Sequence, residues 1–165
     1  MSDTKPKKSG GLAGVVAGQT AIATVGIDGV GLSYRGYSIH DLAQHATFEE
    51  VAFLLLYGHL PLKKELDGFM ARLVSHRRLP DALCRTLEAI PASAHPMDVM
   101  RTGCSMLGVP EPETSPDQQL DRTERLLGSL PSILVYWHRY HVEGIKTATD
   151  SPETSIAGYL LERLH

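Results

Sequence analysis

One apolar stretch constrains the fold of this chain more than any other feature. Residues 51–56 read Val-Ala-Phe-Leu-Leu-Leu, with no polar side chain on any side of a predicted helix. A helix that is apolar all round is normally covered on every side by other parts of a protein. The stretch therefore predicts a helix that lies inside a larger body of helices.

The residues around this stretch carry clear start and stop signals for two helices. Thr47 is a predicted N-cap, with Glu50 at the position where a capping box reaches back to the cap. Gly58 ends the helix where a left-handed residue is favoured, and Pro61 prevents its continuation. Ser38 is the predicted N-cap of a short helix just before.

The residues before Tyr34 predict a small β-hairpin, and those after it predict only helices. Residues 20–25 alternate in polarity, Asp28-Gly29 is a turn signal, and residues 32–34 can return antiparallel. Periodicity and proline or glycine boundaries predict further helices at about 63–75, 80–90, 96–108, 115–143 and from about 153 onward. The predicted fold class is therefore mainly α and multi-helical, with a small N-terminal β-hairpin.

Apolar spacing also predicts which helix faces pack. The predicted buried face at 96–108 is Met97, Met100, Cys104 and Leu107, and Gly103 and Ser105 should let another helix approach. The next helix should bury Leu120, Leu126, Leu127 and Leu130, before a kink or a new helix at Pro131. The apolar faces of the last helices have no predicted partner in this sequence, so we expect exposed apolar patches near Trp137, Tyr140, Tyr159 and Leu160.

Composition excludes several classes of partner. The formal net charge is −3 and the pI about 6.2, which gives no electrostatic basis for binding nucleic acid or an anionic membrane. Residues 1–10 hold the only basic cluster and predict a flexible tail. No apolar run approaches the length of a membrane span, and the N-terminus does not resemble a signal peptide. With Cys84 and Cys104 predicted as two reduced thiols, we expect a cytoplasmic protein.

The ionisable residues assemble no catalytic constellation in the sequence. His138 and His141 could share a metal, but a lone pair without a third ligand is typical of surface histidines, so no metal site is predicted. The run 76–78 (His-Arg-Arg) is either a helix C-terminus that suits cations or an anion site for a carboxylate or phosphate. Arg35 is predicted either to hold a carboxylate or to tie the hairpin to the helices. Arg101 is predicted to form a structural ion pair. No Walker-type loop, GxSxG elbow or HExxH motif is present.

Five segments identify a family. They are 11–15 (GLAGV), 34–37 (YRGY), 48–52 (FEEVA), 58–61 (GHLP) and, most specific, 95–103 (HPMDVMRTG), with Ser105 and Leu107-Gly108 beyond it. In these segments the chain resembles the citrate synthase family, and more closely its bacterial 2-methylcitrate synthase branch. The resemblance extends over nearly the whole chain from about Lys7. Its weakest parts are 109–119 and 143–151.

The resemblance implies a mostly helical enzyme that works as a homodimer and catalyses a Claisen-type condensation. An acyl-CoA, either propionyl-CoA or acetyl-CoA, loses a proton beside its thioester and attacks the ketone of oxaloacetate. An aspartate takes the proton, two histidines stabilise the enol and polarise the ketone, and arginines hold the carboxylates. The acyl-CoA is a substrate here, and no cofactor is implied. The implied pathways are propionate metabolism or the tricarboxylic acid cycle.

The family's HGGAN-type and GHPVY-type histidine segments and its catalytic aspartate have no match in this sequence, so no catalytic residue is carried over. We therefore expect residues 11–165 to be the N-terminal part of the helical domain, truncated and inactive alone. Arg72 and Arg77 are the residues predicted to approach substrate in a complete enzyme, with ordinary surface arginines as the alternative.

Two functions of different classes follow. The chain is either the N-terminal portion of a 2-methylcitrate or citrate synthase, or a non-catalytic truncated paralogue that binds a full-length synthase subunit. A free-standing helical ligand-binding module is a weaker third hypothesis, because it would need a self-sufficient core.

Overall fold

A computed structural model describes residues 15–16, 18–26 and 31–165. The described part begins with a three-stranded antiparallel sheet in the order β1-β2-β3, formed by Ala23–Val25, Leu32–Tyr34 and Tyr37–Ser38. Ala23 pairs with Tyr34 and Val25 with Leu32, which confirms the predicted hairpin pairing. The third strand was not predicted. The predicted turn at Asp28-Gly29 and the predicted tail at 1–10 lie outside the described residues.

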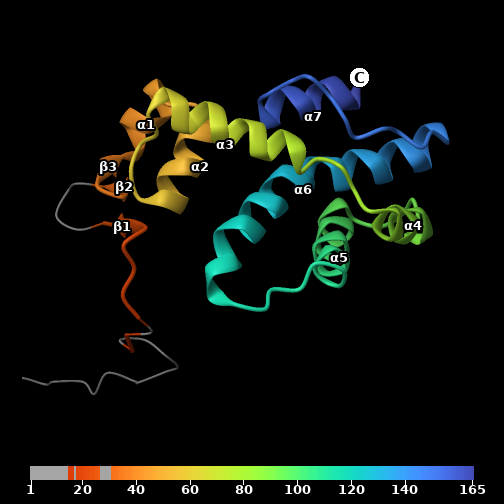
Figure 1. Cartoon of the computed structure of the whole chain (residues 1–165), viewed down its shortest axis with the longest axis horizontal. Helices are drawn as coiled ribbons and strands as arrows, with labels where there is room; N and C mark the ends of the chain where they lie inside the picture. Colours follow the sequence, from red (N-terminus) through yellow and green to blue (C-terminus); the bar gives the residue numbers. More distant parts are fainter. Residues whose placement is uncertain (1–14, 17, 27–30) are drawn as a thin grey trace, which may run out of the picture.

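The rest of the described chain is helical, which confirms the mainly α fold class (Figure 1). Its helices are α1 (Ile39–His45), α2 (Phe48–Tyr57), α3 (Lys63–Ser75), α4 (Asp81–Ala89), α5 (Pro96–Gly108), the short 3-10 helix η1 (Pro116–Gln118), α6 (Gln119–Glu143) and α7 (Ile156–Leu164). Within the described residues, no helix combines the length and the apolar character that crossing a membrane requires.

The predicted helix boundaries of α1 and α2 are confirmed atom by atom. The Ser38 hydroxyl accepts a hydrogen bond from the His40 amide at 3.2 Å. In α2 the Glu50 amide donates to the Thr47 hydroxyl at 3.2 Å, and the Thr47 amide donates to the Glu50 carboxylate at 2.7 Å. Gly58 ends α2 with a φ of 87°, in the left-handed region where a side chain would be strained.

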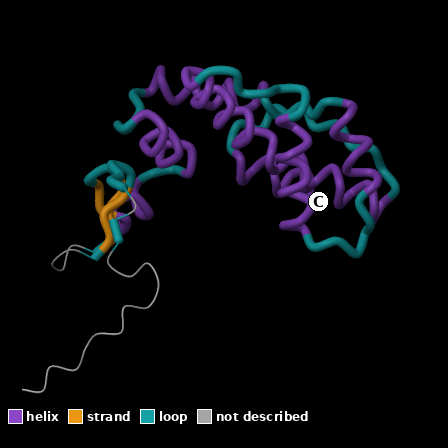
Figure 2. The backbone as a smooth tube through the Cα atoms, turned by 90° about the horizontal axis from the view of Figure 1, so that it is seen from below, coloured by secondary structure: helices purple, strands orange, loops and turns teal. Residues whose placement is uncertain are grey.

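Helix α6 is the element around which the others pack. It contacts α3, α4, α5 and α7 along its length, while α2 lies against α3 and the sheet lies at the far end beside α1 (Figures 1 and 2). One core cluster joins α4, α5 and α6 and consists of Leu79, Leu83, Leu87, Val99, Leu107, Ile133, Tyr136 and Trp137. A second, smaller cluster joins α2 and α3 through Phe53, Phe69 and Leu73.

The predicted buried face of α5 is confirmed at Leu107 and wrong at Met97. Val99, Gly103 and Leu107 are buried, whereas Met97 is 62% exposed. The reason is the glycine, because a Cβ at position 103 would lie only 2.5 Å from Cγ2 of Ile133 on α6. The predicted close approach at Gly103 is therefore confirmed, and it rotates the packed face away from the methionines.

The predicted face of α6 is also wrong in its N-terminal half. Leu120 and Leu126 are 42% and 36% exposed, while Leu127 packs against the smaller core cluster. The helix buries Ser132 against Tyr159 of α7, and it buries Glu124 and Gly128 on the side facing α3. Small residues lie here because α3 comes very close to α6. The helix also continues through Pro131 instead of starting anew, although its direction changes along its length (Figure 1).

The expectation of exposed apolar patches near the C-terminal helices is wrong at Trp137 and Tyr159; Tyr140 and Leu160 are half-buried, and the neighbouring Val142 and Leu161 are exposed. Trp137 is 6% exposed and Tyr159 is fully buried. Helix α7 folds back onto α6, and the Tyr159 hydroxyl donates to the Thr149 carbonyl at 3.0 Å while lying 2.8 Å from the Ser132 hydroxyl. The two helices therefore satisfy each other's apolar and polar groups.

The contact between α3 and α6 gives a stability prediction. A Cβ at position 128 would lie 2.6 Å from the Leu73 carbonyl oxygen and 2.8 Å from the His76 Cβ. Gly128→Ala should therefore lower the free energy of unfolding by about 1–3 kcal/mol, measured by urea denaturation, because backbone must move. Gly108→Ala is the matched control, since a Cβ there meets open space. Equal stability of the two variants would contradict the close helix contact.

Candidate functional site

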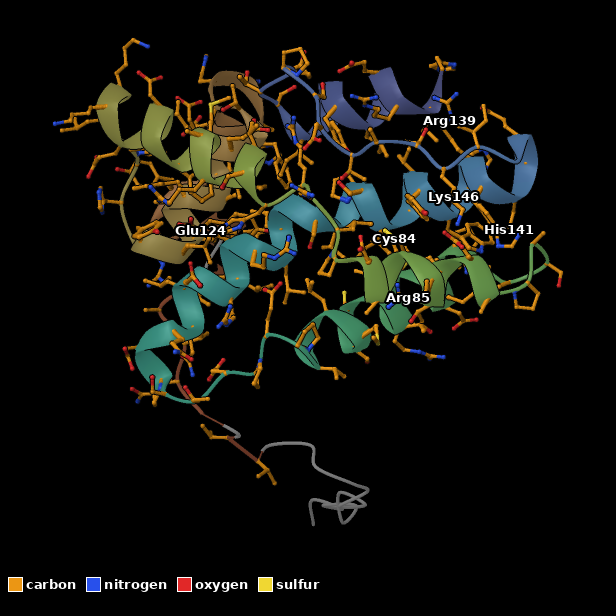
Figure 3. The ribbon with its side chains drawn as sticks, turned by 45° about the vertical axis from the view of Figure 1, so that its right-hand side comes forward. Cys84, Arg85, Glu124, Arg139, His141 and Lys146 are labelled. Carbon is orange, nitrogen blue, oxygen red and sulfur yellow. The ribbon has the colours of Figure 1, made fainter. Side chains whose placement is uncertain are left out.

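Arg72 on α3 pairs with a buried carboxylate on α6. Its Nε donates to Glu124 Oε2 at 2.6 Å and its Nη2 donates to Oε1 at 3.0 Å. The Tyr57 hydroxyl of α2 donates to the same carboxylate. The Glu124 side chain is 3% exposed and that of Arg72 is 47% exposed, so one buried acid joins three helices near the solvent boundary (Figure 3 labels Glu124).

The protonation of this cluster follows from its geometry. Burial raises the pKa of Glu124, but hydrogen bonds from Arg72 and Tyr57 outweigh it and hold the pKa below its ordinary value. The hydrogen bond to Glu124 is the main cause of a raised Arg72 pKa, and burial followed by the bond to Glu124 raises that of Tyr57. At neutral pH the carboxylate is thus ionised and both partners keep their protons.

Arg77 is buried, with 1% of its surface exposed. Its guanidinium donates to the carbonyls of Glu153, Thr154 (3.3 Å) and Ser155 (3.2 Å), just before α7. Its central carbon lies 4.2 Å from the centroid of the Tyr159 ring, a cation–π distance. Burial lowers the pKa of the guanidinium. The surface-arginine alternative is therefore wrong for Arg77, which anchors the start of α7.

The run at 76–78 does not form an open anion site. Arg77 turns inward, and Arg125 of α6 donates to the carbonyls of His76 and Arg78 (3.2 Å) at the end of α3. Arg125 also donates to Glu111, with its Nε 3.1 Å from Oε2. One of the two predictions was that the C-terminus of this helix suits a cation. A cation does bind there, but it is Arg125 of α6 and not a residue of the run 76–78.

Two other candidates from the sequence, Arg35 and Arg101, have structural roles. Arg35 Nη2 donates to the Leu55 carbonyl at 2.9 Å, which confirms that it ties the sheet to α2. Arg101 forms the predicted ion pair, with Asp98 at 3.0 Å. Cys84 and Cys104 are free, and burial raises the pKa of both thiols. The described residues contain no group of three or more His, Cys, Asp or Glu that could hold a metal.

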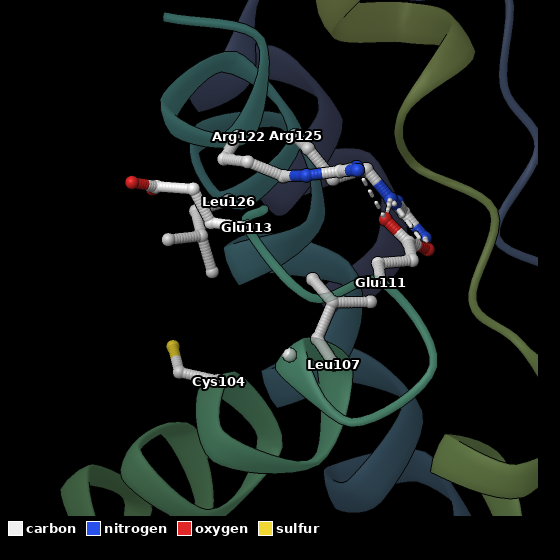
Figure 4. Close-up of a pocket in the computed structure, with 8 residues that line it drawn as sticks. Cys104, Leu107, Glu111, Glu113, Arg122, Arg125 and Leu126 are labelled. Atoms are coloured by element: carbon white, nitrogen blue, oxygen red, sulfur yellow. Dashed lines mark hydrogen bonds and ion pairs between the residues drawn. The ribbon is translucent and has the colours of Figure 1, made fainter. Parts of the chain in front are cut away.

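A hollow of about 160 Å³ lies between α5 and the start of α6 (Figure 4). Cys104 and Leu107 form its apolar side, and Arg122 and Arg125 lie on the opposite side, facing Glu111. Glu111 lies 3.1 Å from Arg125 and 3.6 Å from Arg122, so both cations already have a carboxylate partner. The hollow therefore offers no free charge for a substrate carboxylate.

The structure does not bring the two predicted substrate residues together. Among the described residues, Arg72 and Arg77 share no hydrogen-bonding partner, and their substrate role stays a prediction. Sequence reasoning missed Glu124 and Arg125. The sequence did contain a signal for them. Glu124 and Arg125 come four residues before Gly128 and Ser129, so they lie on the same side of the helix as these small residues, which indicate close packing.

Comparisons with known proteins place this geometry in a family. A family model described as "Citrate synthase, C-terminal domain" matches residues 11–165. The chain belongs to the citrate synthase family. It is 50% identical over all 165 residues to a 2-methylcitrate synthase of Shewanella oneidensis, of which it covers 44%. It is 41% identical over 134 residues to a 2-methylcitrate synthase of Mycobacterium tuberculosis, covering 80% of this chain and 34% of that protein.

Solved citrate synthases share the fold. The enzyme of Thermoplasma acidophilum, solved with carboxymethyl coenzyme A and oxaloacetate, superposes with a TM-score of 0.79 at 22% identity and covers 91% of this chain. The enzyme of Pyrobaculum aerophilum gives a TM-score of 0.74 at 27% identity and 93% of this chain. The chain spans 40% and 41% of these two structures, so it corresponds to less than half of a citrate synthase subunit.

The Glu124 cluster predicts a specific pH dependence. Because the folded-state pKa of Glu124 is lowered, its stabilising effect is present at neutral pH and is lost as pH falls below the ordinary value of 4.5. Glu124→Gln should lower the free energy of unfolding by about 1–3 kcal/mol at pH 7. The difference in the free energy of unfolding between the unsubstituted chain and Glu124→Gln should become smaller below pH 4.5, as measured by urea denaturation at a series of pH values. A gap that stays constant from pH 7 to pH 3.5 would contradict the ion pair.

The Arg77 anchor predicts a local effect at α7. Lysine keeps the charge but cannot donate to three carbonyls in a fixed plane, so Arg77→Lys should loosen α7. Amide hydrogen exchange in 156–164 should accelerate about tenfold or more, which corresponds to roughly 1.4 kcal/mol, while 81–89 in α4 changes little. Arg78→Lys at the exposed neighbouring position is the control. Uniform exchange changes in both helices would argue against a local anchor.

Proposed function

We propose that this chain is the N-terminal portion of a 2-methylcitrate or citrate synthase, which condenses propionyl-CoA or acetyl-CoA with oxaloacetate. The identity of 50% to a 2-methylcitrate synthase over every residue of the chain carries the proposal and favours propionyl-CoA and propionate metabolism. The portion builds scaffold and does not supply catalytic groups. Its sequence contains no HGGAN-type or GHPVY-type segment, and its buried Glu124 and Arg125 are paired with Arg72 and Glu111.

The two arginines have different parts in this proposal. Arg72 keeps 47% of its side chain exposed beside its ion pair with Glu124, so it can approach a substrate carboxylate. Arg77 is buried against α7 and would act by positioning. The complete protein is proposed to be a cytoplasmic homodimer, in which oxaloacetate and acyl-CoA bind only when the rest of the subunit is present.

Thiol release from acyl-CoA tests the proposal. The chain alone should release no coenzyme A from propionyl-CoA or acetyl-CoA with oxaloacetate, because it lacks the family's catalytic histidines and aspartate. Co-expression with the other 56% of the Shewanella oneidensis enzyme, the part outside the 44% that aligns, should restore release. Omitting oxaloacetate is the control for simple thioester hydrolysis.

Turnover by the chain alone would contradict the scaffold role. If the chain instead binds the intact Shewanella enzyme and no combination with the remaining portion is active, the result would favour a non-catalytic paralogue.

A further inference from the structure

An apolar groove of about 270 Å³ lies between α2 and the N-terminal half of α6. Phe48, Val51 and Leu55 line it from α2, and Thr123 and Leu127 line it from α6. Its lining contains no charged side chain. A nucleotide or a carboxylate substrate would find no ionic partner there, so the groove suits an apolar occupant.

The sequence of α2 shows that this side of the helix is one that proteins normally cover. Within the apolar run 51–56, only Phe53 and Leu54 are buried, at 4% and 0% exposure, while Phe48 just before the run is 55% exposed. A helix without polar residues on any face is expected to be enclosed. The described residues enclose α2 fully only at Phe53 and Leu54, so its stripe of Phe48, Val51 and Leu55 is an incompletely covered apolar face.

The two walls of the groove have the spacing that receives a helix. Phe48, Val51 and Leu55 follow an i, i+3, i+7 stripe on α2, and Leu120, Thr123 and Leu127 follow the same stripe on α6. Two such rows form a channel into which the side-chain ridge of a third helix can pack. The ten residues of α2 extend about 15 Å, which matches two to three turns of a partner helix.

We propose that this groove is the docking surface for an apolar helix from the remaining portion of the citrate synthase subunit. The inference rests on the proposed function. Its support is that the chain covers 44% of the relative to which it is 50% identical, so more than half of that subunit lies outside it. A second copy of this chain fits less well, because a two-fold axis through the groove would place one hollow against another and leave both unfilled.

The test uses the full chain with an affinity tag, co-expressed with the portion of the Shewanella oneidensis enzyme that does not align with it. Phe48→Asp places a charge in the groove at the first residue of α2, where the helix dipole favours an acid and the fold is retained. Met97→Asp is the matched control, because Met97 is 62% exposed and lies in the first turn of α5, on the other side of α6. Circular dichroism checks that both variants are folded.

Phe48→Asp should weaken binding of the complement about tenfold or more, and Met97→Asp about twofold or less. In the unsubstituted complex, amide hydrogen exchange in 48–57 and 119–127 should slow. Equal binding by the two variants, no complex at all, or a dimer of this chain alone that Phe48→Asp disrupts would each overturn the assignment.

The activity readout separates this inference from the proposed function. A complex that forms through the groove but releases no thiol would contradict the function and leave the docking surface in place. Restored thiol release that Phe48→Asp does not weaken would contradict the docking surface and leave the function in place.

Discussion

The structure depends on one buried carboxylate that three helices share. Glu124 on α6 accepts hydrogen bonds from Arg72 on α3 and Tyr57 on α2, and it is almost fully shielded from water. A buried charge without partners costs much free energy. If one of the three helices moved away, Glu124 would lose a partner, so this cost keeps the helices in one relative arrangement. The second acid that fixes α2 is Glu49, whose carboxylate accepts the Ile156 amide at the start of α7 at 2.8 Å. Helix α2 is therefore held by these polar contacts and by the packing of Phe53 against α3, while the stripe that begins at Phe48 is less covered.

Close helix contacts and buried hydrogen bonds together explain why Arg77 and Arg125 are not free to bind a substrate. Gly103 lets α5 approach α6 closely at Ile133, and Gly128 lets the end of α3 approach α6 closely at Leu73. Arg125 and Arg77 are used there as donors to backbone carbonyls at the end of α3 and the start of α7. In our proposal the catalytic groups lie outside this chain, which spans 44% of the Shewanella oneidensis relative.

The sequence predicted those features that depend on local interactions. The caps at Ser38 and Thr47, the end of α2 at Gly58 and the range of α3 all follow from residues within four positions of each other. Packing faces were harder, because Met97 and Leu120 look like core residues until the glycine contacts of α5 and α6 fix each helix's rotation. The Glu124 and Arg77 sites join residues that are 52 to 78 positions apart in the chain. The periodicity of a single sequence does not predict contacts between such distant residues. The burial of Trp137 and Tyr159 was missed for the same reason. The third strand pairs locally, Ser38 with Ser33 and Tyr37 with Tyr34, but its two residues are too few to show an alternating pattern.

A double-mutant cycle tests most directly whether Glu124 acts as one shared acceptor. Tyr57→Phe removes one hydrogen bond to its carboxylate and Arg72→Met removes two, and the free energy of unfolding is measured for both single variants and for the double variant. If the three helices are joined through this group, the two changes should be non-additive, with a coupling energy of about 0.5–3 kcal/mol. Additive effects, within about 0.3 kcal/mol, would mean that the two donors act independently and that the shared carboxylate does not hold the helices together.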